Sequence, residues 1–309
     1  MPDVVSIVLR AASFVLQLQA AGTAIFLALF AHRLTAIRPA VRRLGGMCAL
    51  AGIVLVACHQ FLEGARMAGA WAGVFDPAMQ RIALQSSAGA AFALRMLGLA
   101  LIAAALLITT ARRVPMWAAA SLLGAGLCVA AFLATGHTST RPDRPVLAML
   151  LGVHVVVAAF WIGSLWPLHL ASEREPRASA AGLIGAFSSL ALRIVPAIFL
   201  AGVALALLLV PGLAVFSQPY GRLLLCKAAL FGVLLLLAAL NKWKFARQVG
   251  GADLRAAGSA DGVGGADEAG RAAAGGVAFR RTVVAEYVLI CIVLAVTAVM
   301  TGFYSPEGA

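Results

Sequence analysis

The stretch that decides the fold of this chain is VLAMLLGVHVVVAAFWIGSLWPLH, residues 146–169. It contains no lysine, arginine, aspartate or glutamate, and a run of about 20 apolar residues is long enough to cross the hydrocarbon of a membrane as a helix. Similar runs recur along the chain, in which 62% of the 309 residues are hydrophobic and only 12% are charged. Soluble domains carry about 25% charged residues. The composition therefore excludes a soluble enzyme, and we expect an all-α polytopic membrane protein without enzymatic activity.

Hydropathy divides the chain into about eight transmembrane helices, which form a single domain over residues 1–309. The predicted spans are residues 4–31, 45–65, 84–110, 114–135, 146–169, 182–211, 220–243 and 280–303. Residues 1–9 lack the basic leader of a signal peptide, so we expect the first apolar run to remain as a span. An even number of spans places both termini on the same side of the membrane.

The basic residues predict the orientation of the bundle, because loops rich in lysine and arginine stay on the cytoplasmic side. The first, third, fifth and seventh loops hold fifteen such residues, whereas the opposite loops hold only Arg66, Arg81, Arg141 and Arg144. We therefore expect both termini on the periplasmic side of a bacterial inner membrane. The formal net charge of +12 is spread over these loops rather than gathered on one soluble face, so we expect no nucleic-acid partner.

One loop differs from the others in length and composition. Residues 248–278 are rich in glycine and alanine and show no hydrophobic periodicity. Such a segment cannot bury a core of its own. We expect it to be a flexible cytoplasmic linker inside the single domain.

Ionisable side chains within the predicted spans are candidates for a functional site, because each costs about 2.5–3.5 kcal/mol to place in hydrocarbon. His59 and His154 belong to different spans, and the helical rise of about 1.5 Å per residue places both at similar depths in the outer half of the membrane. His137, in the sequence TGHTST, closes the fourth span at the outer surface. Three of the five histidines thus gather in the outer half of the protein.

Methionines and a carboxylate accompany these histidines. Met67 and Met149 lie near the outer ends of their spans, and Glu63 follows His59 by one helical turn in HQFLEGARM. Neutral imidazole and thioether groups suit Cu(I) or Cu(II), whereas Ca²⁺ and Mg²⁺ need clusters of oxygen ligands. The residues therefore predict an outward-facing site for a soft metal ion. Its predicted ligands are His59, His137, His154, Met67 and Met149.

Each of these residues also has an ordinary structural interpretation. A single membrane histidine is as often a hydrogen-bonding partner between helices as a ligand, and scattered methionines usually serve packing. Glu63 and Arg66 can form an ion pair at the rim of the membrane that contributes little. His32 and His169 lie at cytoplasmic helix ends among basic residues, where contact with the helix terminus explains them.

Charged side chains in the remaining spans need partners as well. Arg95 lies near mid-membrane on the third span, and Arg222 and Lys227 begin the seventh span in YGRLLLCK. These basic groups line a hydrated path, pair with a carboxylate in the membrane, or hold an anionic group of a cofactor. For Glu286, near the cytoplasmic end of the eighth span, we expect one of the neighbouring arginines at 280–281 as the partner.

Seven segments occur in a specific order along the chain. They are ARMAG followed by DPAMQRIALQSSAGAAFALRMLGLAL, then TGHTST, HVVVAAFWIGSLWPL, FSSLALRIVPAIFLAG, PYGRLLLCKAALFGVLLLLAALNKWK and RRTVVAEYVLICIVLAVTAVMT. Their order and spacing resemble the copper-resistance D (CopD) family of inner-membrane proteins over nearly the whole chain. The Gly/Ala-rich insert between the seventh and eighth spans is the clearest departure from the family.

The resemblance implies an eight-helix protein that moves copper from the periplasm toward the cytoplasm and receives it from a periplasmic copper-binding protein of the CopC type. It maps family histidines onto His137 and His154, and family basic positions onto Arg95, Arg222 and Lys227. We therefore expect a copper transport and homeostasis protein that carries copper as its cargo. We expect its bundle to be surrounded by membrane lipid. The sequence is compatible with both a monomer and a homo-oligomer.

Two other functions are compatible with the same residues. His59 and His154 could ligate one haem iron axially in a b-type electron carrier, with Arg95 or Arg222 at the propionates. Alternatively, the protein is a non-transporting assembly or resistance subunit whose outer loops dock a metallochaperone.

Overall fold

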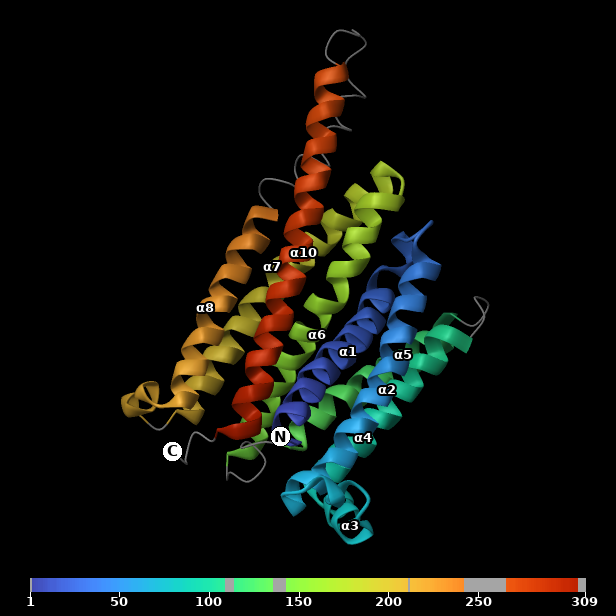
Figure 1. Ribbon diagram of the computed structural model, residues 1–309. Coiled ribbons are helices and arrows are strands. Elements are labelled where there is room, and N and C mark those ends of the chain that lie inside the picture. The colour runs from blue at the N-terminus through green and yellow to red at the C-terminus, as the bar shows by residue number, and fades with distance from the viewer. Residues whose placement is uncertain (1, 109–113, 136–142, 211, 242–264, 305–309) are drawn as a thin grey trace.

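The computed structural model describes residues 2–108, 114–135, 143–210, 212–241 and 265–304 of the chain (Figure 1). Within these ranges the chain is helical and no residue belongs to a strand. The α-helices are α1 (Pro2–Phe30), α2 (Arg38–Ala68), α3 (Pro77–Gln85), α4 (Ser87–Ala103), α5 (Val114–Leu133), α6 (Arg144–Arg174), α7 (Arg177–Leu209), α8 (Pro219–Leu240) and α10 (Gly265–Phe303). Short helical turns are η1 (Ala31–Arg33), η2 (Trp71–Val74), η3 (Ala104–Ile108) and η5 (Leu213–Ser217). Eight of the helices are long and apolar enough to cross a membrane, which confirms the predicted all-α polytopic bundle.

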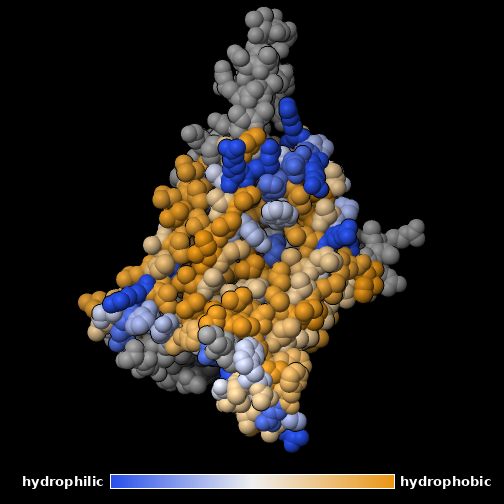
Figure 2. All heavy atoms as spheres, viewed as in Figure 1, coloured by the Kyte–Doolittle hydropathy of each residue, from blue (hydrophilic) through white to orange (hydrophobic). Residues whose placement is uncertain are grey.

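The surface of the bundle has the pattern of a membrane protein. Apolar side chains cover its middle, and hydrophilic patches lie toward its two ends (Figure 2). The start of α1 and the end of α10 lie at the same end of the bundle (Figure 1). We call this the outer end and the opposite one the inner end, after the orientation predicted above.

Helix α1 is the centre of the bundle. Its apolar segment is 67% buried inside the protein, more than that of any other described span. It contacts α2, α4, α5, α6 and α10. Helices α7 and α8 are peripheral, since only 11% and 6% of their apolar segments are buried. The first packs mainly against α6 and the second against α10.

The closest approach between two helices joins α1 to α6. A Cβ atom added to Gly22 would lie 1.7 Å from the carbonyl oxygen of Ala159, and one added to Gly163 would lie 2.2 Å from the carbonyl carbon of Gly22. The hydroxyl of Thr23 donates a hydrogen bond to the carbonyl of Gly163 at 3.4 Å. Small residues of this kind let membrane helices meet backbone to backbone. The two glycines therefore set the position of the central helix against α6.

Helix boundaries differ from the predicted ones in two places. Helix α10 begins at Gly265, so residues 265–278 of the predicted linker are helical, and residues 248–264 lie outside the described residues. Alanine has a high helix propensity, which explains why this stretch continues the helix. The short helix α3 between α2 and α4 was not expected. It begins where the carboxylate of Asp76 accepts a hydrogen bond from the backbone N–H of Ala78 at 2.8 Å.

At the inner end, Glu175 ties two connections together. It follows α6, and its Oε1 accepts hydrogen bonds from the backbone N–H groups of Thr35 at 3.0 Å, Ala36 at 2.9 Å and Ile37 at 3.0 Å. The hydroxyl of Thr35 donates to Oε2. Burial alone would raise the pKa of Glu175, but the hydrogen bonds from Thr35, Ile37 and Ala36 together hold it below the ordinary value of 4.5. The carboxylate thus satisfies the free N–H groups at the start of α2.

The α1–α6 contact predicts a large difference between two glycine substitutions. We expect Gly163→Ala to lower the free energy of unfolding by about 1–3 kcal/mol, because overpacking forces the two backbones apart. In the control variant Gly232→Ala, the new Cβ meets no atom within 4 Å. Unfolding in mixed detergent micelles measures both variants. Equal stability of the two would contradict a tight contact at Gly163.

The hydrogen bonds of Glu175 predict a pH-dependent stability. A carboxylate whose pKa is depressed by folding stabilises the protein above its unfolded pKa, and this contribution is lost as the pH falls through the folded pKa. We expect Glu175→Gln to lower the free energy of unfolding by about 1–3 kcal/mol at neutral pH. The difference in free energy of unfolding between this variant and the wild type should become smaller as the pH falls below 4.5, the ordinary pKa of a glutamate. Glu173→Gln, which changes an exposed carboxylate, is the control. If the effect of Glu175→Gln stays constant with pH, the ionised carboxylate of Glu175 does not stabilise the protein.

Candidate functional site

A cluster of polar side chains lies where α1 begins and α2 ends, at the outer end of the bundle. His59, Glu63 and Arg66 recur about one turn apart and therefore lie on one face of α2. Helix α1 carries polar residues in its first turns that contact this face of α2. We call this set the outer polar cluster; its members are Asp3, Ser6, Arg10, His59, Glu63 and Arg66.

Glu63 joins the members of the outer polar cluster. Its Oε1 lies 3.5 Å from Nε2 of His59 and 3.9 Å from Nη2 of Arg10. Nη1 of Arg66 donates to both carboxylate oxygens, at 3.1 and 3.2 Å. The hydroxyl of Ser6 lies 3.2 Å from the same nitrogen of His59. The imidazole, the carboxylate and two guanidinium groups thus form one connected network.

His59 and Glu63 place two ligand types that bind metals on one face of α2. His59 is 8% exposed, so its position is fixed by the surrounding helices. No group of three His, Cys, Asp or Glu side chains that could hold a metal ion occurs among the described residues. His137 lies outside the described residues, in the connection between α5 and α6, whose flanking helix ends lie at the outer end (Figure 1). Further ligands would therefore have to come from that connection or from methionine.

Arg95 lies deeper in the same half of the bundle, half-buried between aromatic rings. Its Cζ is 5.9 Å from the ring centroid of Phe14 on α1 and 5.7 Å from that of Phe132 on α5. Cation–π contacts of this length stabilise a guanidinium that has left water. Its Nε has no hydrogen-bond partner among the described residues. Arg95 therefore adds positive charge beneath the outer polar cluster, and no described carboxylate forms an ion pair with it.

His154 faces a different part of the bundle from His59. Its Nδ1 lies 3.3 Å from the carbonyl oxygen of Ile198 on α7. Gly202 leaves room for the ring, since a Cβ added there would lie 3.3 Å from Cε1 of His154. The charge of Lys227 on α8 is close enough to act on the imidazole. Since His59 contacts α1 instead, the described contacts do not bring the two imidazoles together, and the haem alternative gains no support.

The remaining predicted residues lie at the surface of the bundle or close to it. Met67 is 49% exposed at the end of α2, and Met149 is 64% exposed near the start of α6. Arg222 is exposed in the first turn of α8, and Lys227 is half-buried further along it. The methionines are therefore accessible but are not joined to the outer polar cluster by any contact described here.

Two features of the site were not predicted. Ser6, which contacts His59, is a small polar residue that carries no signal of its own in the sequence. The expected partner of Glu286 was wrong, since its carboxylate accepts hydrogen bonds from Nε1 of Trp161 at 3.3 Å and from Nδ2 of Asn241. The arginines at 280–281 lie five and six positions earlier, turned by about 120–140° around the helix, so they point elsewhere.

Both halves of the chain match described families. Residues 1–143 match the copper resistance protein D-like, N-terminal domain, and residues 181–300 match copper resistance protein D. The first match contains the outer polar cluster and His137, and His154 lies between the two matches. No solved structure matches the chain.

A curated relative is the copper transport protein CutJ of Bacillus subtilis (strain 168). It is 26% identical over 210 residues, which are 65% of this chain and 39% of CutJ. The aligned part thus spans well under half of that relative. Together with eight membrane-spanning helices, the two family matches show that this chain is a multi-pass membrane protein of the copper resistance protein D (CopD) family.

Proposed function

We propose that this protein transports copper across the bacterial inner membrane, from the periplasmic side toward the cytoplasm. The observation that carries the proposal is the contact between buried His59 and half-buried Glu63, which lies at the outer end of the bundle within the match to the N-terminal family domain. A buried imidazole beside a carboxylate offers a metal ion two ligands without further movement of α2. The distribution of basic loops supports the orientation that places this pair on the periplasmic side.

Copper would first bind at the outer polar cluster. His59 and Glu63 supply the first ligands, and His137, Met67 and Met149 are the proposed additional ones. In the copper-free protein Glu63 is held by Arg10 and Arg66. A metal ion that binds Glu63 must replace the ion pairs of Glu63 with Arg10 and Arg66. The loss of these ion pairs lowers the net affinity for the metal. Weak binding of this kind allows an ion to leave in the forward direction.

From this site copper would pass to His154 at the boundary of α6 and α7. Among the described side chains and backbone groups, His154 has one hydrogen-bond partner, the carbonyl of Ile198, so one ring nitrogen remains for a metal. Lys227, Arg95 and Arg222 are proposed to line or electrostatically tune the path. The sequence contains no nucleotide-binding loop, so we propose transport in which this chain itself uses no ATP.

A periplasmic copper-binding protein of the CopC type is the proposed donor of the ion. The outer polar cluster presents Asp3 and Arg66 in an exposed ion pair at its edge, with a distance of 3.3 Å. Such paired surface charges orient a partner more than they add affinity. The donor would therefore deliver copper directly above His59.

Copper binding should depend on His59 but not on His32, which is exposed at the inner end of the bundle. We expect His59→Ala to weaken copper binding by about tenfold or more, as is common when a metal site loses one of its supporting groups. Competition with a copper chelator measures the affinity of each purified variant. Equal affinities of His59→Ala and His32→Ala would remove the proposed site.

Copper flux should depend on His154, whereas copper binding at the outer polar cluster should not. We expect proteoliposomes with His154→Ala to take up copper several-fold more slowly than the wild type, because the ion has lost its next ligand along the path. Radioactive copper or inductively coupled plasma analysis measures uptake. Wild-type protein that binds copper without any flux would instead favour the docking role.

A further inference from the structure

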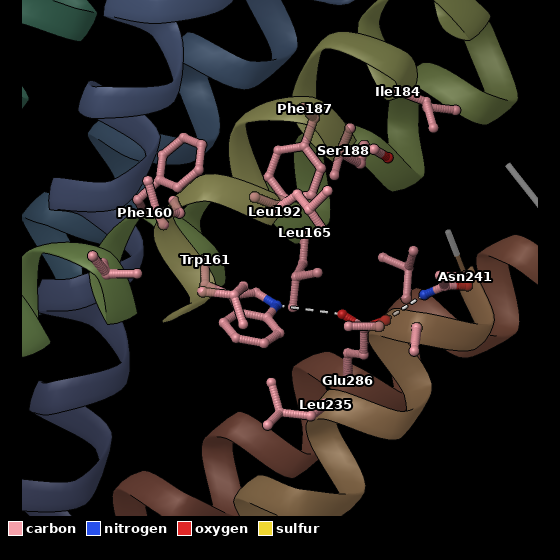
Figure 3. A pocket seen from close by; sticks show the side chains of 18 of the residues that line it. Phe160, Trp161, Leu165, Ile184, Phe187, Ser188, Leu192, Leu235, Asn241 and Glu286 are labelled. Atoms are coloured by element: carbon pink, nitrogen blue, oxygen red, sulfur yellow. Dashed lines mark hydrogen bonds between the residues drawn. The ribbon is translucent and has the colours of Figure 1, made fainter. Parts of the chain in front are cut away.

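A cavity of about 180 Å³ lies in the inner half of the bundle, at the opposite end from the outer polar cluster. Residues of α6, α7, α8 and α10 line this partly open cavity, and most of them are apolar. Figure 3 shows Glu286, Asn241 and Trp161 along one side of it, opposite Phe187 and Leu192 of α7. The cavity thus combines an apolar wall with one ionisable group.

Glu286 is held in this cavity by neutral donors. It is 3% exposed, and its two oxygens accept from the indole N–H of Trp161 and the amide of Asn241. The hydroxyl of Thr282 donates in turn to the amide oxygen of Asn241. Three side chains from α6, α8 and α10 therefore orient the carboxyl group without supplying a positive charge.

None of the charged or titratable groups on the neighbouring helices forms an ion pair with Glu286 among the described residues. His169 of α6 is stacked on Trp166, with ring centroids 5.2 Å apart, and Trp166 in turn meets Tyr287 of α10. The other such groups on these helices whose side chains the structure describes are Arg144, His154, Glu173, Arg174, Arg177, Arg193, Tyr220, Arg222, Cys226, Lys227, Arg280, Arg281 and Cys291. Within the part of the chain that the structure describes, Glu286 thus has no counter-charge, and ionisable groups buried in membrane helices mark proton relays and ion pathways.

The cavity also lies on a boundary between two pairs of helices. Helix α7 packs on α6, and α8 packs on α10, while Glu286 and Asn241 lie where the two pairs meet. A volume of about 180 Å³ has room for several water molecules, each of which occupies about 30 Å³ in the liquid. When Glu286 is charged, a hydrated and open boundary between the two helix pairs is favoured, because burying an unpaired charge is costly. When Glu286 is neutral, the apolar walls of the cavity can close around it.

We propose that Glu286 binds and releases a proton during transport, and that this proton couples the movement of copper to the pH gradient across the membrane. The inference rests on the proposed transport function and adds its coupling ion. The proton enters and leaves at the carboxyl oxygens of Glu286, while Trp161 and Asn241 keep the group at the boundary between the two helix pairs.

Copper accumulation in proteoliposomes under an imposed pH gradient tests the proposal, with the membrane potential clamped by potassium and valinomycin. If one proton moves with each copper ion, a gradient of one pH unit shifts the steady-state copper ratio by about tenfold in the wild type. Glu286→Gln keeps one acceptor oxygen, for either Trp161 or Asn241, and cannot titrate, so the shift should disappear. Glu173→Gln, at an exposed carboxylate of α6, should keep it.

Two further measurements keep the outcomes distinct. Copper binding at the outer polar cluster shows that Glu286→Gln is folded, and the carboxyl band in infrared difference spectra during a pH titration reports protonation without any transport. We expect this band in the wild type and in Glu173→Gln but not in Glu286→Gln. Copper uptake by the wild type that does not change with the pH gradient would overturn the coupling but not the transport function. The same conclusion would follow if Glu286→Gln retained the shift of the copper ratio with the pH gradient. Complete absence of uptake in the wild type would overturn the transport function itself.

Discussion

Polar and charged side chains inside the hydrocarbon of a membrane are costly unless they find partners within the protein. In this bundle the partners come from different helices. Glu63 of α2 meets Arg10 of α1, and Arg95 of α4 lies between rings of α1 and α5. Glu286 of α10 is held by α6 and α8. Each such group therefore determines which helices must lie next to one another.

The central helix α1 turns these local contacts into one arrangement. Its glycine contact with α6 brings the backbones together, and its outer turns carry half of the outer polar cluster. The peripheral helices α7 and α8 are held mainly through α6 and α10. The outer polar cluster thus lies on the tightly packed part of the bundle, whereas the cavity with Glu286 is lined in part by the peripheral helices α7 and α8.

The sequence predicted the eight spans and the CopD family correctly, because hydropathy and the order of motifs are local properties of the chain. It also selected His59 and Glu63, since a spacing of one helical turn shows that they share a face. It did not predict that Ser6 contacts His59 or that Trp161 and Asn241 hold Glu286. Those contacts join positions far apart in sequence, and their geometry depends on how whole helices pack. The sequence placed His154 within a span, but it could not predict that His154 faces Ile198 of α7.

The most direct test of the account is the location of copper in the protein itself. Crystals or particles of the copper-loaded wild type, analysed by anomalous diffraction at the copper edge or by cryo-electron microscopy, would locate the ion. The account predicts copper within bonding distance of Nε2 of His59, with Glu63 turned from Arg66 toward the metal. Copper bound elsewhere, with the His59–Glu63–Arg66 network unchanged, would contradict it.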